Sequence, residues 1–540
     1  MSKFIFITGG VVSSLGKGLT AASIGLLLRA RGLNVRMQKL DPYINVDPGT
    51  MNPFQHGEVF VTDDGAETDL DLGHYERFAG VRANRQSNYT TGRIYLDIIE
   101  RERRGDFLGG TVQVVPHVTN AIQDAILKNA APEVEVNIVE LGGTVGDIEG
   151  LPYIEAFRQF SLDRPVEEVM FIHLTLIPYL RASGEVKTKP TQHSVQKLRE
   201  FGVQPDMLIC RAEVPIDDEQ RRKIGMFCHI RTGDVIIEKD VDHSIYEVPL
   251  LLEREGVADK ICKRFNLATG APNLTQWEEM VTRVIHPAGE VEIAVVGKYM
   301  TLTDSYKSVY EALAHGGAAN HVRVKIRKIE AEDLEKDGVK ALAGVGGLLV
   351  PGGFGKRGVE GKMLAIQWAR ENNVPFLGLC YGMQCAVIEF ARHVCGEAGA
   401  LSGEWLEGGK GNENQPEYIT IMPGQVRVTD KGGSMRLGAY ACQLKPESKS
   451  RQLYDAEVVR ERHRHRYELN PEKIPTLEQH GMLIAGRNPD SRLVEIIELP
   501  AHPFFIATQA HPEFRSRPIS AHPLFAGFIK AAMAQGKVES

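Results

Sequence analysis

Short apolar runs alternate with stretches of helical periodicity through residues 1–265. The apolar runs predict strands, and a helix is predicted over about residues 19–31. The predicted strands cover residues 4–8, 35–39, 112–115, 136–139, 169–176 and 207–210. Strands that alternate with helices favour a mostly parallel sheet that is covered by helices on both faces. We therefore expect an α/β domain in this half of the chain.

The pattern breaks at residues 266–290, where strand-like runs stop and Pro and Gly recur, so this segment is predicted to be a linker. A second α/β pattern begins at Glu292. Its predicted strands are 293–297, 322–326, 347–350 and 374–379, its predicted helices lie near 305–315 and 358–371, and the polar tract 408–417 predicts a loop. The expected architecture is α/β with two doubly wound domains, 1–265 and 291–540.

Length and composition agree with this division. A chain of 540 residues is too long for one hydrophobic core, because single cores stop growing at about 250–300 residues. The net charge of -7 gives no general attraction to nucleic acid or to an anionic membrane, so a polyanionic substrate must be bound locally. No apolar run approaches the ~20 residues that span a bilayer. Seven cysteines without metal-ligand spacing favour reduced thiols and a cytoplasmic protein.

A candidate nucleophile, Cys380, stands where a predicted strand meets a predicted helix. Gly378 and Gly382 flank it in the pattern GxCxG, which permits the sharp turn of a nucleophile elbow. The start of the following helix favours the thiolate form. Cysteines in apolar runs are commonly buried packing residues, and we keep that interpretation for Cys385 and Cys395.

The other groups that a cysteine nucleophile requires occur elsewhere in the second half. His511 is a candidate general base, and Glu513, two positions along, is suited to orient its imidazole. The run PGGFG at residues 351–355 follows a predicted strand, and its unobstructed N–H groups are candidates for an oxyanion site. Together these motifs indicate nucleophilic attack by a cysteine on a carbonyl carbon.

A glycine-rich loop over residues 9–20 joins the first predicted strand to the first predicted helix. Its N–H groups, the helix N-terminus and Lys17 are suited to bind phosphates. The loop departs from the regular P-loop, because Val11 replaces the first Gly and Gly18 stands where Ser or Thr would bind magnesium. By itself the loop is compatible with nucleotide binding or with a merely tight turn.

Two acidic residues and one basic segment extend the candidate chemistry of the first half. Asp71, in the stretch TDLDLG, and Glu140, at the end of a predicted strand, are candidate magnesium ligands. The segment KTKPTQ at residues 187–192 places two ammonium groups in a region that is predicted to be non-helical. Alone, this segment is also compatible with an ordinary basic surface loop.

Several of these motifs resemble known enzyme families. GLCYGMQ, PGGFG and HPE resemble the class I glutamine amidotransferases, whose pattern GxCxGxQ is matched at Gly378, Cys380, Gly382 and Gln384. SSLGKGLTAAS, ELGGTVGDIEG and SGEVKTKPTQHSV occur in the order found in the CTP synthase family, and this resemblance extends over essentially the whole chain. It implies a P-loop-like amidoligase domain over 1–265 and a class I glutamine amidotransferase domain over 291–540.

For the first domain, the resemblance implies amination of UTP at C4 in pyrimidine nucleotide biosynthesis. ATP phosphorylates the 4-oxygen of UTP, ammonia attacks C4, and phosphate leaves to give CTP. Lys17 and Lys39 would lie near the transferred phosphoryl group, and Asp71 and Glu140 would bind Mg²⁺. ATP would be bound by Ser14, Leu15, Gly16, Lys17, Gly18, Leu19 and Asp71. UTP and the feedback inhibitor CTP would be bound by Ser13, Asp147, Ile148, Glu149, Lys187, Thr188, Lys189, Pro190, Thr191, Gln192 and Lys223.

For the second domain, the resemblance implies that Cys380, His511 and Glu513 hydrolyse glutamine through a thioester and release ammonia. His56 would line the ammonia passage. Glutamine would be bound by Gly353, Tyr381, Gly382, Met383, Gln384, Glu404 and Arg466. The family also implies GTP as an allosteric activator and a homotetramer, with no nucleic-acid or membrane partner.

Two alternatives stay open at this point. One is another ATP-dependent amidoligase with a C-terminal glutaminase, of the cobyrinic acid amide synthase type, which shares a deviant phosphate loop. KTKPTQ and GGTVGDIEG weigh against it. The other is a nucleotide-switched scaffold without catalysis, because related loops occur in partitioning ATPases and a fold alone does not fix function. An intact set of Cys380, His511 and Glu513 argues against that scaffold.

Overall fold

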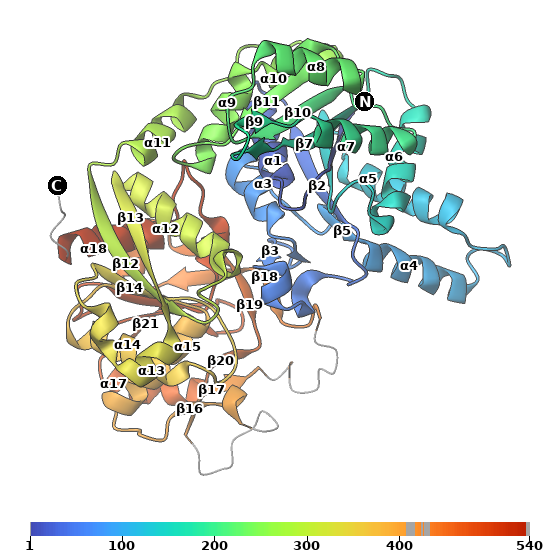
Figure 1. Ribbon diagram of the computed structural model, residues 1–540. Coiled ribbons are helices and arrows are strands. Elements are labelled where there is room, and N and C mark those ends of the chain that lie inside the picture. The colour runs from blue at the N-terminus through green and yellow to red at the C-terminus, as the bar shows by residue number, and fades with distance from the viewer. Residues whose placement is uncertain (1, 407–415, 423–424, 426–431, 536–540) are drawn as a thin grey trace. The chain divides into compact units, whose positions relative to one another are not determined.

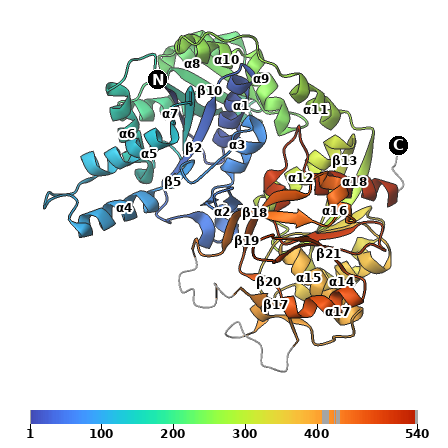
Figure 2. The ribbon, with the colours of Figure 1, turned by 180° about the vertical axis from the view of Figure 1, so that it is seen from behind.

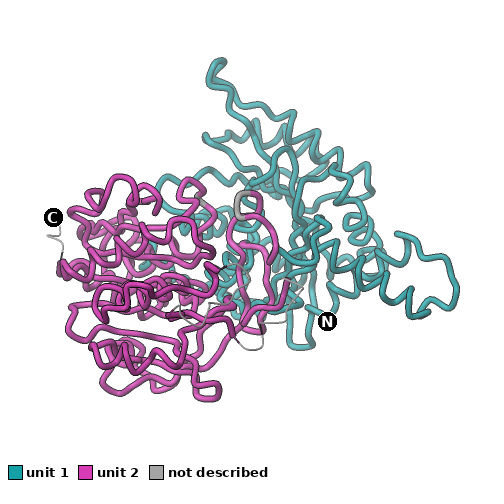
Figure 3. The backbone as a smooth tube through the Cα atoms, turned by 90° about the horizontal axis from the view of Figure 1, so that it is seen from below, with its two compact units in different colours: residues 1–48, 71–281 teal, residues 49–70, 282–540 magenta. Residues whose placement is uncertain are grey.

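The computed structural model describes residues 2–406, 416–422, 425 and 432–535. They form two compact units (Figure 3). Unit 1 contains residues 1–48 and 71–281, and unit 2 contains residues 49–70 and 282–540. Across the described part of the chain, no helix is long and apolar enough to cross a membrane.

Unit 1 is built on a seven-stranded parallel sheet in the order β11-β10-β7-β1-β6-β2-β5 (Figure 1). Its strands are β1 Lys3–Gly9, β2 Val35–Asp41, β5 Asn88–Thr90, β6 Val136–Leu141, β7 Val169–Ile177, β10 Met207–Ala212 and β11 Val235–Lys239. Its helices are α1 Lys17–Ala30, α3 Asp71–Ala79, α4 Thr91–Arg104, α5 Thr119–Asn129, α6 Leu151–Leu162, α7 Lys189–Glu200, α8 Asp218–Cys228, α9 Val248–Arg254 and α10 Val257–Arg264. α11, Thr275–Ile285, lies within the segment predicted to be a linker.

Side-chain alternation along β1 separates the two faces of this sheet. Phe6 packs on Phe157 of α6, with ring centroids 4.3 Å apart. On the other face, α1 approaches β2 so closely that a Cβ on Gly25 would lie 3.0 Å from the sulfur of Met37. The sheet is thus covered on both faces, as the sequence predicted.

Two predictions in this half are wrong. Residues 112–115 form no strand: Val114 and Val115 are exposed at the surface, and Val114–Val118 form a short π-helical turn instead. The segment 187–192 is not wholly non-helical, since α7 begins at Lys189. Pro190 in its first turn is compatible with a helix, because the first N–H groups of a helix have no intrahelical acceptor.

Unit 2 has a nine-stranded sheet in the order β13-β12-β14-β15-β23-β22-β21-β18-β19 (Figures 1 and 2). The run from β13 to β23 is parallel, and the remaining neighbours are antiparallel. Its strands are β12 Gly289–Gly297, β13 Val322–Glu330, β14 Gly347–Val350, β15 Phe376–Leu379, β18 Arg436–Leu444, β19 Val458–His465, β21 Leu483–Arg487, β22 Val494–Glu498 and β23 Phe505–Thr508. A small sheet adds β16 Leu401–Ser402, β17 Glu417–Ile421 and β20 Tyr467–Leu469.

Helices cover both faces of the nine-stranded sheet, which confirms the predicted α/β class. α14 and α15 contribute to one hydrophobic core, and α12 and α18 contribute to the other. The helices of unit 2 are α12 Lys307–Ala319, α13 Ala331–Asp337, α14 Val359–Glu371, α15 Tyr381–His393, α16 Lys449–Tyr454, α17 Ile474–Gln479 and α18 Pro523–Gln535. Most of the predicted loop 408–417 lies outside the described residues.

Residues 49–70 belong to unit 2, although they fall within the expected amidoligase domain. The segment contains α2 Pro53–His56 and a hairpin of β3 Phe60–Val61 and β4 Glu67–Thr68. Phe60 packs edge-on against Phe514, with ring centroids 5.1 Å apart. Asp63 and Glu67 form ion pairs with Arg462 (2.6 Å) and Arg464 (2.8 Å) respectively. These contacts attach the segment to β19 and to the loop after β23.

The turn between β15 and α15 requires glycine at residue 382. A Cβ on Gly382 would lie 2.1 Å from the backbone oxygen of Val350 in β14, a distance that real side chains do not reach. We predict that Gly382→Ala destabilises the protein by about 1–3 kcal/mol, because the backbone must move. Gly399→Ala is the matched control, because its Cβ would meet Pro416 at an ordinary 3.4 Å. Thermal unfolding measures both changes, and equal unfolding temperatures for the two variants would contradict the packing argument.

Candidate active sites

Cys380 lies at the junction of β15 and α15 with φ 49° and ψ -101°. A positive φ is strained for a residue other than glycine, and such strain is typical of functional positions. The backbone N–H of Cys380 donates to Thr508 O at 2.7 Å, which holds the strained turn against β23. The predicted elbow is therefore present, with a thiol that is buried but for 4% of its surface.

His511 and Glu513 form the expected pair. Nδ1 of His511 lies 2.7 Å from Oε1 of Glu513, and the ring of Phe514 stacks on the imidazole. The backbone N–H of His511 donates to Arg462 O at 2.7 Å, which fixes the histidine against β19. Burial lowers the pKa of His511, but Glu513 and Cys380 raise it more, so that it stands at about 10. An imidazolium is thus favoured beside the thiol.

A cavity of about 280 Å³ brings Cys380, His511 and Glu513 together with the PGGFG loop. Gly352 abuts the imidazole, because a Cβ there would lie 2.8 Å from Cε1 of His511. Only glycine lets the loop backbone come this close. The cavity is also lined by Gly49, Thr50, Met51, Gly57, Glu58, Val59, Tyr299, Ser305, Tyr306, Val309, Gly353, Phe354, Arg464 and Phe514.

Polar side chains hold the backbone of the PGGFG loop through hydrogen bonds. Gly355 N–H donates to Oε1 of Glu404 at 2.9 Å, and Lys298 Nζ donates to Phe354 O at 2.6 Å. The hydroxyl of Tyr381 donates to Gly355 O and accepts from Trp405 at 3.0 Å. Burial raises the pKa of Glu404 and lowers that of Lys298 to about 8. These hydrogen bonds stabilise the loop in the conformation that lines the cavity.

The predicted glutamine-binding residues do not all converge. Gly353 lines the cavity, whereas Gln384 donates to Tyr467 O at 3.0 Å. Arg466 donates to Gln425 and Ser434 and does not line the cavity, although Arg464 does. Three further residues of the site belong to no recognised motif: Arg464 lines the cavity, Lys298 holds the PGGFG loop, and Gln509 contacts Cys380.

His56, the predicted ammonia-passage residue, also lies in unit 2 but does not line the cavity. His56 Nε2 is 3.2 Å from Asp69, while its neighbours Gly57 and Glu58 line the cavity. Glu58 accepts from the N–H and hydroxyl of Ser308, at the start of α12. This contact holds the segment beside the cavity.

In unit 1, the glycine-rich loop joins β1 to α1 and places Lys17 at the first helical position. The lysine side chain folds back over Gly9, where a Cβ would lie 2.6 Å from Lys17 Cδ. Its Nζ donates to Gly143 O at 2.6 Å. Burial, followed by the nearby Lys39 ammonium, lowers the pKa of Lys17. An anion would relieve this crowding of positive charge.

Lys39, Asp71 and Glu140 form a buried cluster beside this loop. Lys39 and Glu140 are register partners on β2 and β6, so their side chains share a face. Lys39 Nζ pairs with Asp71 and lies 2.8 Å from Oε1 of Glu140. A Cβ on Gly18 would lie 2.1 Å from Asp71 Oδ1. The carboxylate therefore takes the space where a regular P-loop has its Ser or Thr side chain.

This cluster fits a magnesium ion together with nucleotide phosphates. Two carboxylates converge on one point, and magnesium in phosphoryl-transfer sites is bound by one or two carboxylates plus phosphate oxygens. Within the described residues, no group of three or more His, Cys, Asp and Glu could hold a metal without such help. Asp71 and Glu140 would therefore supply only part of the coordination of such an ion.

The predicted UTP residues fall into two groups. Thr188, Lys189, Gln192 and Lys223 line one surface hollow together with Arg199. Ser13, Lys187 and the stretch 147–149 do not line it. Asp147 instead accepts from Thr144 N–H at 3.1 Å, and Lys187 pairs with Glu185. Their roles stay predictions.

Comparisons with known proteins cover almost the whole chain. Residues 3–267 match the family model described as CTP synthase N-terminus, and residues 301–531 match glutamine amidotransferase class-I. A CTP synthase of Caldanaerobacter subterraneus subsp. tengcongensis is 55% identical over 536 residues, covering 99% of this chain and 98% of that protein. A CTP synthase of Pelobacter propionicus is 54% identical over 536 residues, covering 99% of both. The solved glutaminase domain of Trypanosoma brucei CTPS with bound acivicin is 38% identical, with a TM-score of 0.41, and covers 46% of this chain and 96% of that chain.

The raised pKa of His511 leads to a prediction about pH. Glu513→Gln removes the carboxylate that raises the pKa of His511 most, so that burial lowers this pKa from about 10 although Cys380 still opposes the change. In the native protein, the stabilisation from this pair is complete below about pH 6.5 and is lost as pH rises through about 10. NMR titration of the imidazole measures the shift, and glutamine hydrolysis is expected to fall about 10²-fold.

The exposed carboxylate of Glu472 supplies the control for this substitution. Glu472→Gln is expected to change neither the titration nor the hydrolysis rate. An unchanged titration of His511 in Glu513→Gln would contradict the assigned pairing.

Proposed function

Because the chain belongs to the CTP synthase family, we propose that unit 2 releases ammonia from glutamine and that unit 1 uses ATP to attach it to UTP. The enzyme is a glutamine-hydrolysing ligase that forms a C–N bond. One observation carries the assignment of roles. A single chain contains both the Cys380–His511–Glu513 set and a phosphate loop with Lys39, Asp71 and Glu140 beside it. The cobyrinic acid amide synthase alternative is not favoured by the relatives.

The glutaminase reaction begins from a Cys380 thiolate beside a His511 imidazolium, the charge state that the raised pKa of His511 favours. The thiolate attacks the amide carbon of glutamine, and the oxyanion is stabilised by N–H groups of the PGGFG loop. The imidazolium then protonates the leaving nitrogen, so that ammonia departs and a thioester remains. Water activated by His511 hydrolyses the thioester to glutamate. Glu513 orients the imidazole and favours its charged form throughout.

The ligase reaction consumes this ammonia at C4 of UTP. The 4-oxygen of UTP attacks the γ-phosphorus of ATP, ADP leaves, and the phosphorylated oxygen becomes a good leaving group. Ammonia attacks C4 and phosphate departs. Residues 14–19 are assigned to hold the ATP phosphates, and the ammonium groups of Lys17 and Lys39 neutralise charge on the transferred group. The positive crowding of these two lysines supports this role.

Asp71 and Glu140 are assigned to hold Mg²⁺. When bound, the ion would neutralise phosphate charge and polarise the transferred phosphoryl group. Lys39, now paired with both carboxylates, would be released to approach the phosphates. Tyr75, which donates to Glu140, keeps that carboxylate in place.

Substrate recognition is assigned as follows. Thr188, Lys189, Gln192 and Lys223, which share one hollow, are proposed to bind the UTP or CTP triphosphate, with the other predicted UTP positions joining them in the bound state. In unit 2, Glu404 has a carboxylate oxygen beyond the one that accepts from Gly355, and it suits the α-ammonium of glutamine. Arg466 is proposed for the α-carboxylate, and His56 for the ammonia passage.

Regulation, assembly and compartment are also proposals. We assign GTP as activator, CTP as feedback inhibitor and a homotetramer on the strength of the family. A cytoplasmic location is supported by seven cysteines that are all free thiols.

Removing the nucleophile is expected to separate the two activities. Cys380→Ala should abolish CTP formation from glutamine, because no thioester can form, while CTP formation from added ammonium chloride should remain within about twofold of wild type. Absorbance or chromatographic detection of CTP measures both rates. Cys395→Ala, a partly buried cysteine of the same unit, is the control and should keep both. Loss of both activities in a folded Cys380→Ala variant would contradict the two-site model.

The reverse separation is expected at the phosphate loop. Lys17→Ala should lower CTP formation from either nitrogen source by about 10²-fold or more, because charge on the transferred phosphoryl group is no longer neutralised. Glutamine hydrolysis without nucleotide should be unchanged. Glutamate release and CTP formation are measured in parallel, with the exposed Lys128→Ala as control. A wild-type rate of amination in Lys17→Ala would exclude the assigned role.

A further inference from the structure

Gln509 lies beside the Cys380 thiol in unit 2, and no role has been given to it above. Its Nε2 is 3.6 Å from Cys380 Sγ, and the glutamine side chain is fully buried. We propose that the Gln509 amide donates a hydrogen bond to the Cys380 thiolate and that Gln384 fixes the orientation of this amide. The proposal deepens the glutaminase role of Cys380 and rests on that proposed function.

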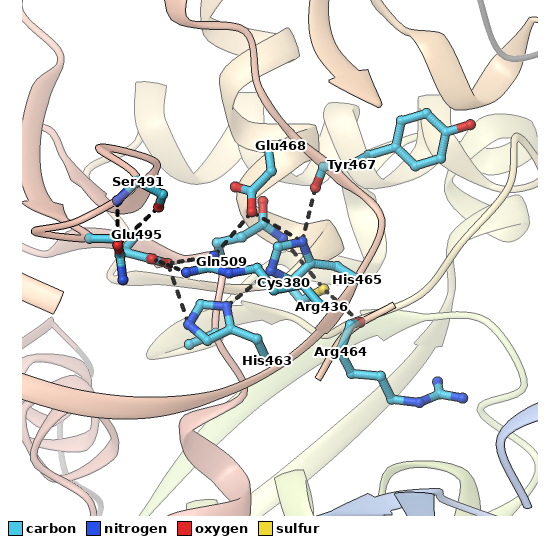
Figure 4. Close-up of polar contacts among 12 residues, drawn as sticks. Cys380, Arg436, His463, Arg464, His465, Tyr467, Glu468, Ser491, Glu495 and Gln509 are labelled. Atoms are coloured by element: carbon cyan, nitrogen blue, oxygen red, sulfur yellow. Dashed lines mark hydrogen bonds and ion pairs between the residues drawn. The ribbon is translucent and has the colours of Figure 1, made fainter. Parts of the chain in front are cut away.

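The orientation of Gln509 follows from a chain of hydrogen bonds. Gln384 Nε2 lies 3.0 Å from the carbonyl oxygen of Tyr467, and a carbonyl can only accept. Gln384 therefore presents its NH₂ group on this side. The same nitrogen lies 3.3 Å from Oε1 of Gln509, which must then be the amide oxygen. The NH₂ group of Gln509 is left to face the sulfur (Figure 4).

The carbonyl of Tyr467 is itself held by a buried pair of histidines. His465 Nδ1 is 3.1 Å from this carbonyl, so it carries the proton and leaves Nε2 as an acceptor. His463 Nδ1, 3.0 Å away, must then donate to His465 Nε2. Burial lowers the pKa of both histidines well below the usual value, which agrees with neutral rings. The donor and acceptor directions are thus consistent from His463 Nδ1 to Gln509.

A buried ion cluster lies beside His463, whose Nε2 carries no proton in this assignment. His463 Nε2 lies 3.4 Å from Glu495, and Arg436 pairs with Glu495 at 2.7 Å and with Glu468 at 3.0 Å (Figure 4). One guanidinium between two buried carboxylates holds β18, β20 and β22 together. Breaking such a pair is costly, because a charge is left buried without its partner. These ion pairs therefore stabilise the strands that surround the hydrogen-bonded residues leading to Gln509.

The thiolate needs this donor because its other neighbour opposes it. Cys380 Sγ also lies 4.0 Å from the backbone oxygen of Arg464, a group that accepts from a thiol and repels a thiolate. An amide N–H favours the charged form and lowers the pKa of the group that accepts it. His511 receives the proton, while Gln509 stabilises the sulfur that loses it. The two residues have different tasks in one step.

The test measures the pH dependence of Cys380 alkylation by iodoacetamide in the full chain. Mass spectrometry of the peptide that contains Cys380 separates this thiol from the other six. Gln509→Leu should raise the midpoint of the rate profile by about one pH unit, which is about a tenfold loss of thiolate below the midpoint. Gln384→Leu should shift it in the same direction by less, and the double variant should match Gln509→Leu alone.

Controls separate this effect from a general loss of structure. Gln367→Leu, on the outer side of α14, should leave the midpoint unchanged. Gln509→Glu keeps the shape of the side chain but places an anionic oxygen near the sulfur, so it should raise the midpoint further. This second variant tests the proposal if Gln509→Leu does not fold. The other titratable groups of the cavity are unaltered by these substitutions: Glu58, Tyr299, Tyr306, Arg464, His511 and Glu513.

An unchanged midpoint in a folded Gln509→Leu or Gln509→Glu variant would overturn the proposal, as would additive shifts in the double variant. Alkylation needs no glutamine. The result therefore stays readable even if the wild-type protein failed to hydrolyse glutamine, which would instead refute the proposed function.

Discussion

Strand β19 is the element on which the geometry of unit 2 depends. The backbone oxygen of Arg462 accepts from His511 N–H, and that of Arg464 contacts the Cys380 sulfur. The same strand therefore positions both the base and the nucleophile. Its arginine side chains are fixed in turn by Asp63 and Glu67. A buried guanidinium without its carboxylate would be costly, and these ion pairs hold the strand in register. The precision of the catalytic pair thus originates in contacts that do not touch the substrate.

Unit 1 uses the same physical rule in a different way. The buried ammonium of Lys39 is balanced by Asp71 and Glu140, and the desolvated Lys17 is held by a carbonyl. Each of these two ammonium groups has a partner within the protein, and the phosphates of a bound nucleotide can take the place of that partner. A site of this kind folds stably and still presents charged groups where phosphates are transferred.

Local patterns explain what the sequence could predict. The strand-to-turn-to-helix pattern around Cys380, the PGGFG loop and most strands of both sheets are indicated by the order of neighbouring residues. Gln509 could not be recognised, because its role depends on Gln384, a residue far away in the chain that fixes the direction of its amide. The strand prediction for residues 112–115 was wrong because an apolar run does not reveal whether another strand lies beside it. The place of residues 49–70 was also hidden, since nothing local indicates which core will bury Phe60.

The position of residues 49–70 also bears on how such a chain evolves. Both ends of the segment continue directly into unit 1, yet Phe60, Asp63 and Glu67 contact residues of unit 2. Unit 2 is therefore encoded by two separate stretches of sequence. Residues 49–70, which lie in the N-terminal half of the chain, must stay compatible with the C-terminal half. Across relatives, residues 63 and 67 should covary with residues 462 and 464 rather than with their own neighbours in sequence. Exchanging one half between distant relatives would bring mismatched charges to β19, which favours keeping the two halves together as one gene.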